Sequence, residues 1–510
     1  MTTSTICITI TIVLYLAGML WIGAHYAKKN ASASDFYLGG RKLGPLVTAM
    51  SAEASDMSSY LLMGLPGLAY LTGMADVGWT AIGLAAGTYL NWLFTARRLR
   101  RYTQITGSYT LPQFFSQRFK DSKSILAAIS ALIIIVFFIP YTASGFSACG
   151  KLFSSLFGVN YITAMIVSAI VIVGYTAAGG FLAASLTDLV QSIIMTISIF
   201  FVLIFATAQA GGFGAVMENA KALPGFLSFS QTYTGSGAAP YGPLTVISTL
   251  AWGLGYFGMP HILLRFMAIE DEKKLVLSRR IASIWVVIAM SVAIFIGMVG
   301  LAMTNAGALD LLEGSASETV IVRIAGLISQ TGPLAAIVAG VILAGILAAT
   351  MSTADSQMLA AASSVSQNLM QDFLHIKMTE KQSLTAARLT ILGVSVLGVV
   401  LARDPNSSVF GIVSFAWAGF GGAFGAVMLL ALFWRRCNAQ GALAGMLAGG
   451  VTVFVWKYLV RPLGGVWNIY ELLPAFLTAL AACVIVSLVT PAPDAAVCAE
   501  FDAVAAKEQA

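Results

Sequence analysis

The chain has 510 residues, of which 58% are hydrophobic and only 10% charged, and its mean hydropathy is +0.86. Soluble globular domains carry about 25% charged residues, so the composition excludes that class and predicts a membrane protein. The net charge of +6 is better explained by membrane topology than by nucleic-acid binding.

The chain contains many apolar windows of membrane-spanning length. A transmembrane helix needs about 20 mostly apolar residues, and thirteen windows meet this need. They are residues 5–26, 46–71, 76–96, 124–147, 160–181, 188–209, 244–267, 281–303, 333–357, 386–402, 408–434, 439–459 and 470–490. We therefore expect an all-α polytopic membrane protein of about 13 transmembrane helices.

Basic residues predict how these helices are oriented. With the N-terminus outside, 22 of the 28 Lys and Arg residues fall in cytoplasmic segments, which is the positive-inside pattern. The C-terminal tail is then cytoplasmic. The expected cytoplasmic segments are residues 27–45, 97–123, 265–280, 371–388, 435–438 and 491–510. Residues 210–243, rich in Gly and Pro, are expected to form an irregular external loop.

A polar break interrupts the second apolar window. Residues 51–60 read Ser-Ala-Glu-Ala-Ser-Asp-Met-Ser-Ser-Tyr, and Glu53 and Asp56 each cost about 2.5–3.5 kcal/mol on insertion scales. Small and hydroxyl side chains around Asp56 favour an unwound helix whose carbonyls face a cation. The alternative is a network of hydrogen bonds between helices that only stabilises the bundle.

A second break lies in the seventh window. Residues 251–261 contain three glycines and Pro260, which disfavours a continuous helix. Because the two broken windows are five apart, they cross the membrane in opposite directions, as an inverted five-plus-five repeat requires. The expected divisions are 1–45 (first span and loop), 46–209 (first repeat), 210–243 (external loop), 244–434 (second repeat), 435–490 (two peripheral spans) and 491–510 (tail).

Hydroxyl side chains end the ninth window. Ala349, Ser352 and Thr353 stand at i, i+3 and i+4 and so share one helix face. Two hydroxyls with freed carbonyls suit a small hard cation such as sodium that must be released in each cycle. The alternative is that both hydroxyls bond only to carbonyls of their own helix.

Three aromatic residues are candidates for a solute site. Trp252 and Tyr256 are i, i+4 neighbours beside the glycine break, and Tyr141 lies late in the fourth window. Such rings enclose the apolar part of a ligand and donate one hydrogen bond, or else pack the core or form an interfacial belt. The three histidines and five cysteines are scattered, so we expect free thiols, no metal cluster, no cofactor and no enzymatic chemistry.

Several motifs together resemble the bacterial sodium/solute symporter family. The resemblance spans about residues 10–490 and is strongest to the family's proline-transporting members. The motifs are Asp35-Phe36-Tyr37-Leu38-Gly39-Gly40-Arg41, Ser55-Asp56-Met57-Ser58, Leu62-Met63-Gly64-Leu65-Pro66-Gly67, Trp252-Gly253-Leu254-Gly255-Tyr256-Phe257-Gly258 and Met351-Ser352-Thr353.

The resemblance implies a leucine-transporter-like core and sodium-coupled symport in the bacterial inner membrane, without an obligate protein partner. Sodium would be a co-substrate, bound by carbonyls of Ala54, Met57 and Ala349 and hydroxyls of Ser352 and Thr353. The resemblance further implies that Asp56 and Ser58 couple ion and solute, that Tyr60, Tyr141, Trp252, Tyr256 and Pro260 line the solute site, and that Arg41 and Asp188 are functionally sensitive. For Asp188, a helix-start cap is the alternative.

Two positions depart from the pattern of proline symporters. Ser59 and Tyr60 replace a typical glycine and tryptophan, and Glu53 stands where some members have a small residue. We expect sodium-coupled import of L-proline or a close analogue. The alternatives are another amino acid, pantothenate or a short carboxylate as solute, proton coupling through Asp56 and Glu53, a channel, or a membrane sensor.

Overall fold

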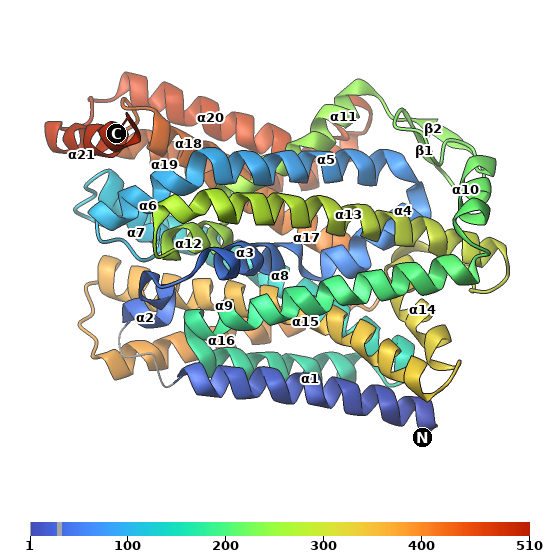
Figure 1. Cartoon of the computed structure of the whole chain (residues 1–510). Coiled ribbons are helices and arrows are strands. Elements are labelled where there is room, and N and C mark those ends of the chain that lie inside the picture. Colours follow the sequence, from blue (N-terminus) through green and yellow to red (C-terminus); the bar gives the residue numbers. More distant parts are fainter. Residues whose placement is uncertain (1, 28–32, 510) are drawn as a thin grey trace.

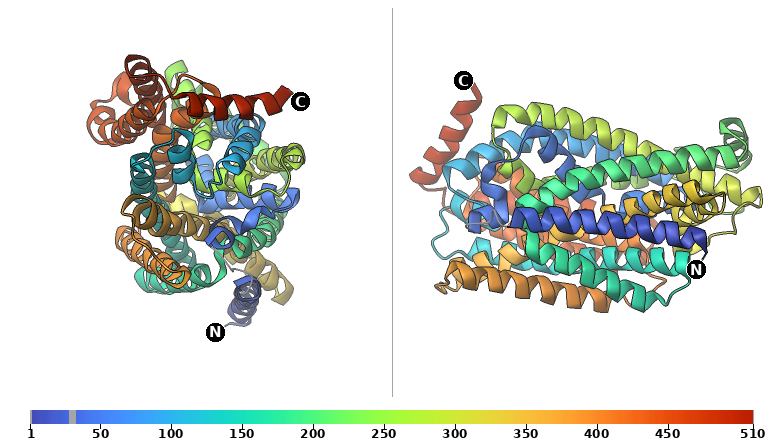
Figure 2. Two further views of the ribbon diagram at one scale, coloured as in Figure 1. Left: turned by 90° about the vertical axis from the view of Figure 1, so that its left-hand side faces the viewer. Right: turned by 60° about the horizontal axis from the view of Figure 1, so that its bottom comes forward.

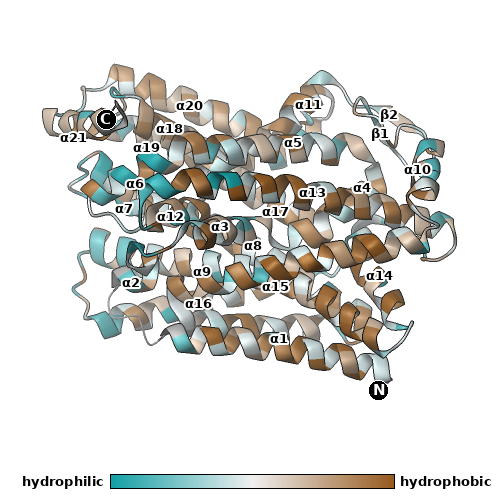
Figure 3. Cartoon of the chain, viewed as in Figure 1, coloured by the Kyte–Doolittle hydropathy of each residue, from teal (hydrophilic) through white to brown (hydrophobic). Residues whose placement is uncertain are grey.

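The computed structural model describes residues 2–27 and 33–509; residues 28–32, part of the expected cytoplasmic segment 27–45, lie outside the described residues. Long helices run side by side along one direction and are joined by short connections at both ends (Figure 1). Apolar residues dominate the middle of these helices, and polar residues gather toward the ends (Figure 3). This distribution is what a bundle that spans a bilayer requires.

The first part of the chain folds into ten helices: α1 (Thr3–Ala27), α2 (Ala33–Leu38), α3 (Pro45–Ser59), α4 (Leu65–Thr72), α5 (Met74–Leu90), α6 (Ala96–Ile105), α7 (Leu111–Arg118), α8 (Ile125–Phe157), α9 (Tyr161–Gln209) and α10 (Phe213–Ala222). Two short antiparallel strands follow, β1 (Gln231–Tyr233) and β2 (Ala238–Pro240), with Gln231 opposite Pro240.

The second part contains α11 (Pro243–Leu250), α12 (Pro260–Ala268), α13 (Leu275–Asn305), α14 (Val320–Ser329), α15 (Pro333–Ser363), α16 (Glu380–Leu401), α17 (Val409–Phe420), α18 (Ala426–Phe433), α19 (Ala439–Val455), α20 (Leu472–Val489) and α21 (Ala495–Gln509). Short 3₁₀ or π-helical turns complete the chain: η1 (Gly39–Arg41), η2 (Tyr60–Gly64), η3 (Asn91–Thr95), η4 (Ala251–Gly258), η5 (Glu272–Lys274), η6 (Gly314–Thr319), η7 (Ser364–Phe373), η8 (Gly421–Gly425), η9 (Trp456–Val460), η10 (Arg461–Leu463) and η11 (Gly465–Trp467).

Nine helices within the described residues are long and apolar enough to cross a membrane. The predicted windows 46–71, 76–96, 160–181 and 244–267 lie on interrupted or shorter helices, so the count of thirteen spans stays a prediction. The windows 160–181 and 188–209 are the two arms of α9, which meet at a kink at Gly180 (φ 70°, ψ −179°) without a loop between them. Glycine adopts this positive φ readily, so the helix resumes at once.

Both predicted helix breaks are present. In α3 the break is a single residue, Ser58, whose φ of 50° and ψ of −167° lie outside the helical region. The second break is longer: α11 gives way to the 3₁₀ turn η4, and Met259, which follows that turn, is extended before Pro260 begins α12. Helix α12 packs against α3, so the two interrupted segments lie side by side.

The two ends of the bundle differ in structure. The N-terminus lies at the same end as α10, β1 and β2, whereas the C-terminus lies at the opposite end, near α6 and α7 (Figure 1). The prediction that residues 210–243 are irregular is wrong in detail, because this segment contains α10 and a β-hairpin. Two hydrogen bonds connect this segment to α5: the Met74 backbone N–H donates to the Phe226 carbonyl at 2.7 Å, and the Trp79 side-chain Nε1 donates to the Phe229 carbonyl at 2.9 Å.

Helix α21 lies across the end of the bundle that holds the C-terminus (Figure 2). The Phe501 ring is contacted by the guanidinium groups of Arg98, at 4.8 Å, and Arg118, at 5.1 Å. Arg435 forms an ion pair with Asp502 at 2.9 Å, and this hydrogen-bonded guanidinium lowers the pKa of the Asp502 carboxyl. Cation–π contacts and ion pairs therefore hold the tail helix.

Gly87 marks the closest approach between α5 and η4. A Cβ atom added there would lie 2.4 Å from the Gly253 carbonyl oxygen, which is backbone and cannot move aside. We expect Gly87→Ala to destabilise the fold by about 1–3 kcal/mol and to lower the melting temperature of the purified protein. Gly393→Ala is the matched control, since nothing lies within 4 Å of its added Cβ. Equal melting temperatures for the two variants would contradict this packing.

Candidate functional site

The break in α3 meets the hydroxyl-bearing face of α15. Ser352 Oγ donates to the Ala54 carbonyl at 2.8 Å and lies 3.2 Å from the Ala349 carbonyl. Thr353 Oγ1 lies 3.5 Å from the Ala54 carbonyl and 3.1 Å from that of Ala349. Four oxygens from two helices therefore converge, and all four residues are buried. The alternative of hydroxyls bonded only within their own helix is wrong, because both also reach α3.

Asp56 lies beside this oxygen cluster and faces the second broken helix. Tyr256 Oη donates to Asp56 Oδ2 at 2.5 Å, and Tyr141 Oη donates to the Asp56 carbonyl at 3.3 Å. Asp56 is only 5% exposed and so depends on such donors. Tyr141 is 1% exposed, so the alternative of an interfacial belt residue is wrong. Through its carboxylate and its backbone carbonyl, Asp56 thus joins α3 to η4 and to α8.

Four aromatic rings pack together where the chain leaves α3 at Tyr60. The Tyr60 and Trp252 rings stack at 5.8 Å, and Trp252 stacks on Tyr470 at 4.9 Å. Phe410 lies 5.7 Å from Tyr60 and 5.6 Å from Trp252. Rings from four segments thus form one aromatic wall, which we define as Tyr60, Trp252, Phe410 and Tyr470. Such a wall suits the apolar part of a ligand.

The other predicted site residues occupy different positions around this centre. Met57 is 1% exposed and precedes the break at Ser58, and Pro260 is buried at the start of α12. Arg41 lies elsewhere, near the ends of α6 and α12, where its guanidinium donates to the carbonyls of Met267 at 2.6 Å and Ser108 at 2.7 Å. Arg41 therefore ties helix ends together instead of contacting Asp56.

Asp188 belongs to a buried ion pair. It lies inside α9, so the alternative of a helix-start cap is wrong. Its Oδ2 accepts from Arg265 Nη2 at 3.0 Å and from Ser51 Oγ at 2.7 Å, and Arg265 Nη2 also contacts Ser356 Oγ at 2.5 Å. Arg265, the first residue of the expected cytoplasmic segment 265–280, is packed inside the bundle, since its side chain is 1% exposed. The pair joins α3, α9, α12 and α15.

Removing one partner of this buried ion pair is expected to lower the stability of the protein much more than replacing both partners by apolar residues. Asp188→Leu removes the carboxylate that is hydrogen-bonded to the Arg265 guanidinium, which we expect to destabilise the protein by about 3–5 kcal/mol. In the double variant Asp188→Leu/Arg265→Met the charge is gone, and most of the loss should be recovered. Melting temperatures in one detergent measure both effects. If the double variant melts no higher than Asp188→Leu, the ion pair is not what stabilises this region.

Sequence reasoning missed the partners of two further buried charged residues, Glu53 and Lys151. Glu53, 1% exposed, accepts one hydrogen bond from Trp92 Nε1 at 3.3 Å. Lys151 Nζ pairs with Glu318 Oε2 at 2.6 Å, and Glu318 also accepts from Ser408 Oγ at 2.8 Å at the start of α17. These partners lie 39 to 167 residues apart in sequence, so no local pattern indicates them.

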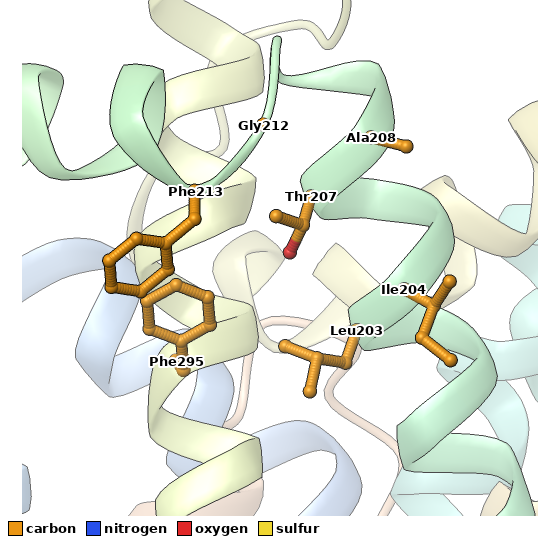
Figure 4. Close-up of a pocket in the computed structure, with 7 residues that line it drawn as sticks. All are labelled: Leu203, Ile204, Thr207, Ala208, Gly212, Phe213 and Phe295. Carbon is orange, nitrogen blue, oxygen red and sulfur yellow. The ribbon is translucent and has the colours of Figure 1, made fainter.

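A surface groove near α10 is unrelated to this centre. Leu203, Thr207, Phe213 and Phe295 are among the residues that line it, and none of the predicted site residues does (Figure 4). Phe213 of α10 stacks on Phe295 of α13 at 5.5 Å. Because its lining is almost entirely carbon, this groove offers no group that would orient a polar solute.

Two interrupted helices beside a hydroxyl-bearing third, around a buried carboxylate, define a membrane transporter of the broken-helix class. The model of the sodium:solute symporter family matches residues 36–449, and the chain belongs to this family. The predictions of a transporter instead of an enzyme, and of sodium as co-substrate, are thereby confirmed at the level of the family.

Individual relatives cover nearly the whole chain. It is 42% identical to a sodium/proline symporter of Haemophilus influenzae over 97% of this chain and 96% of the relative. It is 40% identical to the osmoregulated proline transporter OpuE of Bacillus subtilis over 95% of each. Among solved structures, a Na⁺-coupled sialic acid symporter in a substrate-bound outward-open state matches with a TM-score of 0.77 and 17% identity, over 96% of this chain and 99% of that one. This last likeness confirms the predicted fold class.

Proposed function

We propose that this chain imports L-proline, or a close analogue, together with sodium across the bacterial cytoplasmic membrane. The observation that carries the proposal is the meeting of Asp56, the Ala54 carbonyl and the Ser352 and Thr353 hydroxyls at the break in α3. The names of the similar proteins, a sodium/proline symporter and a proline transporter, support proline as the solute.

Sodium would bind where α3 and α15 meet. The proposed ligands are the carbonyls of Ala54, Met57 and Ala349 and the hydroxyls of Ser352 and Thr353. The Ala54 and Ala349 carbonyls already lie within 3.5 Å of these hydroxyls. An all-oxygen set without a dense cluster of charges suits an ion that is bound and released in every cycle.

The solute would lie between Asp56 and the aromatic wall. Its ammonium would face Asp56 and Ser58, while its ring would contact Tyr60, Tyr141, Trp252, Tyr256 and Pro260. Bound sodium favours the conformation that accepts solute, and by linkage bound solute tightens sodium by the same factor. Arg41 and Asp188, which tie helix ends and helices together, would transmit closure on one side to opening on the other.

The proposed orientation places the N-terminus outside and the C-terminus in the cytoplasm. Two observations support it: 22 of 28 basic residues fall in the expected cytoplasmic segments, and the N-terminus shares one end of the bundle with α10, β1 and β2 (Figure 1). The positive-inside rule then puts α2, α6, α7 and α21 in the cytoplasm.

Uptake into proteoliposomes tests this function. Labelled L-proline should accumulate against its gradient when a sodium gradient is imposed, and a proton gradient alone should not drive it. Other amino acids, pantothenate and short carboxylates serve as competitors. Accumulation of one of these solutes in place of proline would replace the proposed substrate, and uptake that never exceeds equilibrium would indicate a channel.

A further inference from the structure

A small polar cavity lies beside the proposed ion site, between the break in α3, α8 and α15. Its volume is about 10 Å³, and it is lined by Ser58, Ser59, Tyr141, Thr142, Thr353 and Gln357, among others; we call it the Ser59 cavity. Tyr141 also contacts the Asp56 carbonyl, and Thr353 contacts the Ala54 carbonyl. The Ser59 cavity therefore shares Thr353 with the proposed sodium site and Tyr141 with the backbone contact to Asp56.

Two polar atoms of this lining have no hydrogen-bond partner within the described residues. They are Ser59 Oγ and Gln357 Nε2, and both residues are 1% exposed. The Gln357 amide is oriented by Thr142, whose Oγ1 donates to Gln357 Oε1 at 3.2 Å. Because buried polar groups in proteins are almost always paired, two orphaned groups on one cavity indicate a place for a polar ligand atom.

The other hydroxyls around the cavity are already engaged. Ser144 Oγ donates to the Tyr141 carbonyl at 2.6 Å, and Thr350 Oγ1 donates to the Ile346 carbonyl at 2.9 Å. The unmet capacity is therefore one amide donor and one hydroxyl, in a space about the size of a single water molecule. A neutral hydroxyl group fits both, since it accepts from Gln357 Nε2 and donates to Ser59 Oγ.

We propose that the Ser59 cavity is a subsite for a hydroxyl group of the transported solute, so that a ring-hydroxylated imino acid is a better substrate than L-proline. This inference rests on the proposed function, because it assumes that the ammonium of an imino acid is held at Asp56. L-Proline leaves Ser59 Oγ and Gln357 Nε2 unsatisfied or paired only with water, whereas the hydroxylated ring satisfies both. A site built to bond a substrate hydroxyl discriminates against the analogue that lacks it.

The test is sodium-driven uptake of three labelled solutes by the full chain in proteoliposomes: L-proline, trans-4-hydroxy-L-proline and its cis epimer. We expect kcat/KM for one epimer to exceed that for L-proline by about 10-fold or more. Ser59→Ala and Gln357→Met should each bring this ratio close to one, mainly through KM for the hydroxylated solute. Ser144→Ala is the matched control, because its hydroxyl lines the same cavity but is already bonded, and it should keep the ratio.

The outcomes separate the two proposals. Sodium-driven uptake of L-proline with no preference for either epimer, or a preference that survives both Ser59→Ala and Gln357→Met, overturns the subsite and leaves the proposed function standing. Failure of sodium to drive uptake of any of the three solutes overturns both. If Ser59→Ala is not inserted into membranes, Ser59→Gly removes the same hydroxyl at the helix break and decides the same question.

Discussion

Replacing Ser352 and Thr353 together by alanine is expected to abolish sodium-stimulated uptake. Both hydroxyls reach the Ala54 carbonyl, at 2.8 and 3.5 Å, and they are two of the five proposed sodium ligands. An interaction between a polar group and a charged one contributes about 1.5–3 kcal/mol. Losing two such ligands of the sodium ion should therefore raise the sodium concentration for half-maximal uptake by roughly 100-fold or more. Initial uptake rates against sodium concentration measure this change.

Ser363→Ala is the matched control for this variant. Ser363 lies on the same helix, and its hydroxyl donates to the Ala360 carbonyl of that helix at 2.9 Å. We expect its sodium dependence to match that of the unaltered protein. Normal sodium dependence in the double variant, with both proteins inserted at equal levels, would remove Ser352 and Thr353 from the ion site.

Replacing Asp56 by alanine is expected to reduce solute uptake by roughly 1,000-fold. The carboxylate is the proposed partner of the solute ammonium, and truncating one side of a buried, hydrogen-bonded charge pair costs about 2–5 kcal/mol or more of binding free energy. The substitution also leaves the Tyr256 hydroxyl, now 2.5 Å from Asp56 Oδ2, without its acceptor. Uptake and solute binding by the purified variant measure the loss.

Asp56→Asn separates charge from hydrogen bonding at this position. The amide oxygen can still accept from Tyr256, so the fold should be preserved while the ammonium loses its counter-charge. We expect Asp56→Asn to bind solute almost as poorly as Asp56→Ala. Strong binding by Asp56→Asn would show that the carboxylate positions Tyr256 instead of pairing with the solute.

The two helix breaks can be predicted from sequence because their causes are local. Asp56 among small and hydroxyl residues, and Pro260 after three glycines, each disfavour a continuous apolar helix. The structure refines the form of each break: one residue of positive φ, Ser58, in α3 and a 3₁₀ turn before α12. The direct junction of the two arms of α9 at Gly180 is not predictable in this way, because hydropathy alone does not distinguish a kink from a connecting loop.

The contacts of the candidate site can be predicted only where one helix face carries them. Ser352 and Thr353 are recognisable at i+3 and i+4 from Ala349, and they do meet Ala54. The pairing of Asp188 with Arg265 joins residues 77 positions apart, and hydropathy places Arg265 at a helix end beyond the membrane. Orphaned groups such as Ser59 Oγ and Gln357 Nε2 emerge only when three helices are assembled.

The most direct test is equilibrium binding of radiolabelled sodium to the purified protein, with and without L-proline. If one site couples ion and solute, proline should lower the Kd for sodium by the same factor by which sodium lowers the Kd for proline, and both effects should vanish in Ser352→Ala/Thr353→Ala. A Kd for sodium that is the same with and without proline, or that is unchanged in this variant, would contradict a shared ion and solute site at the break in α3.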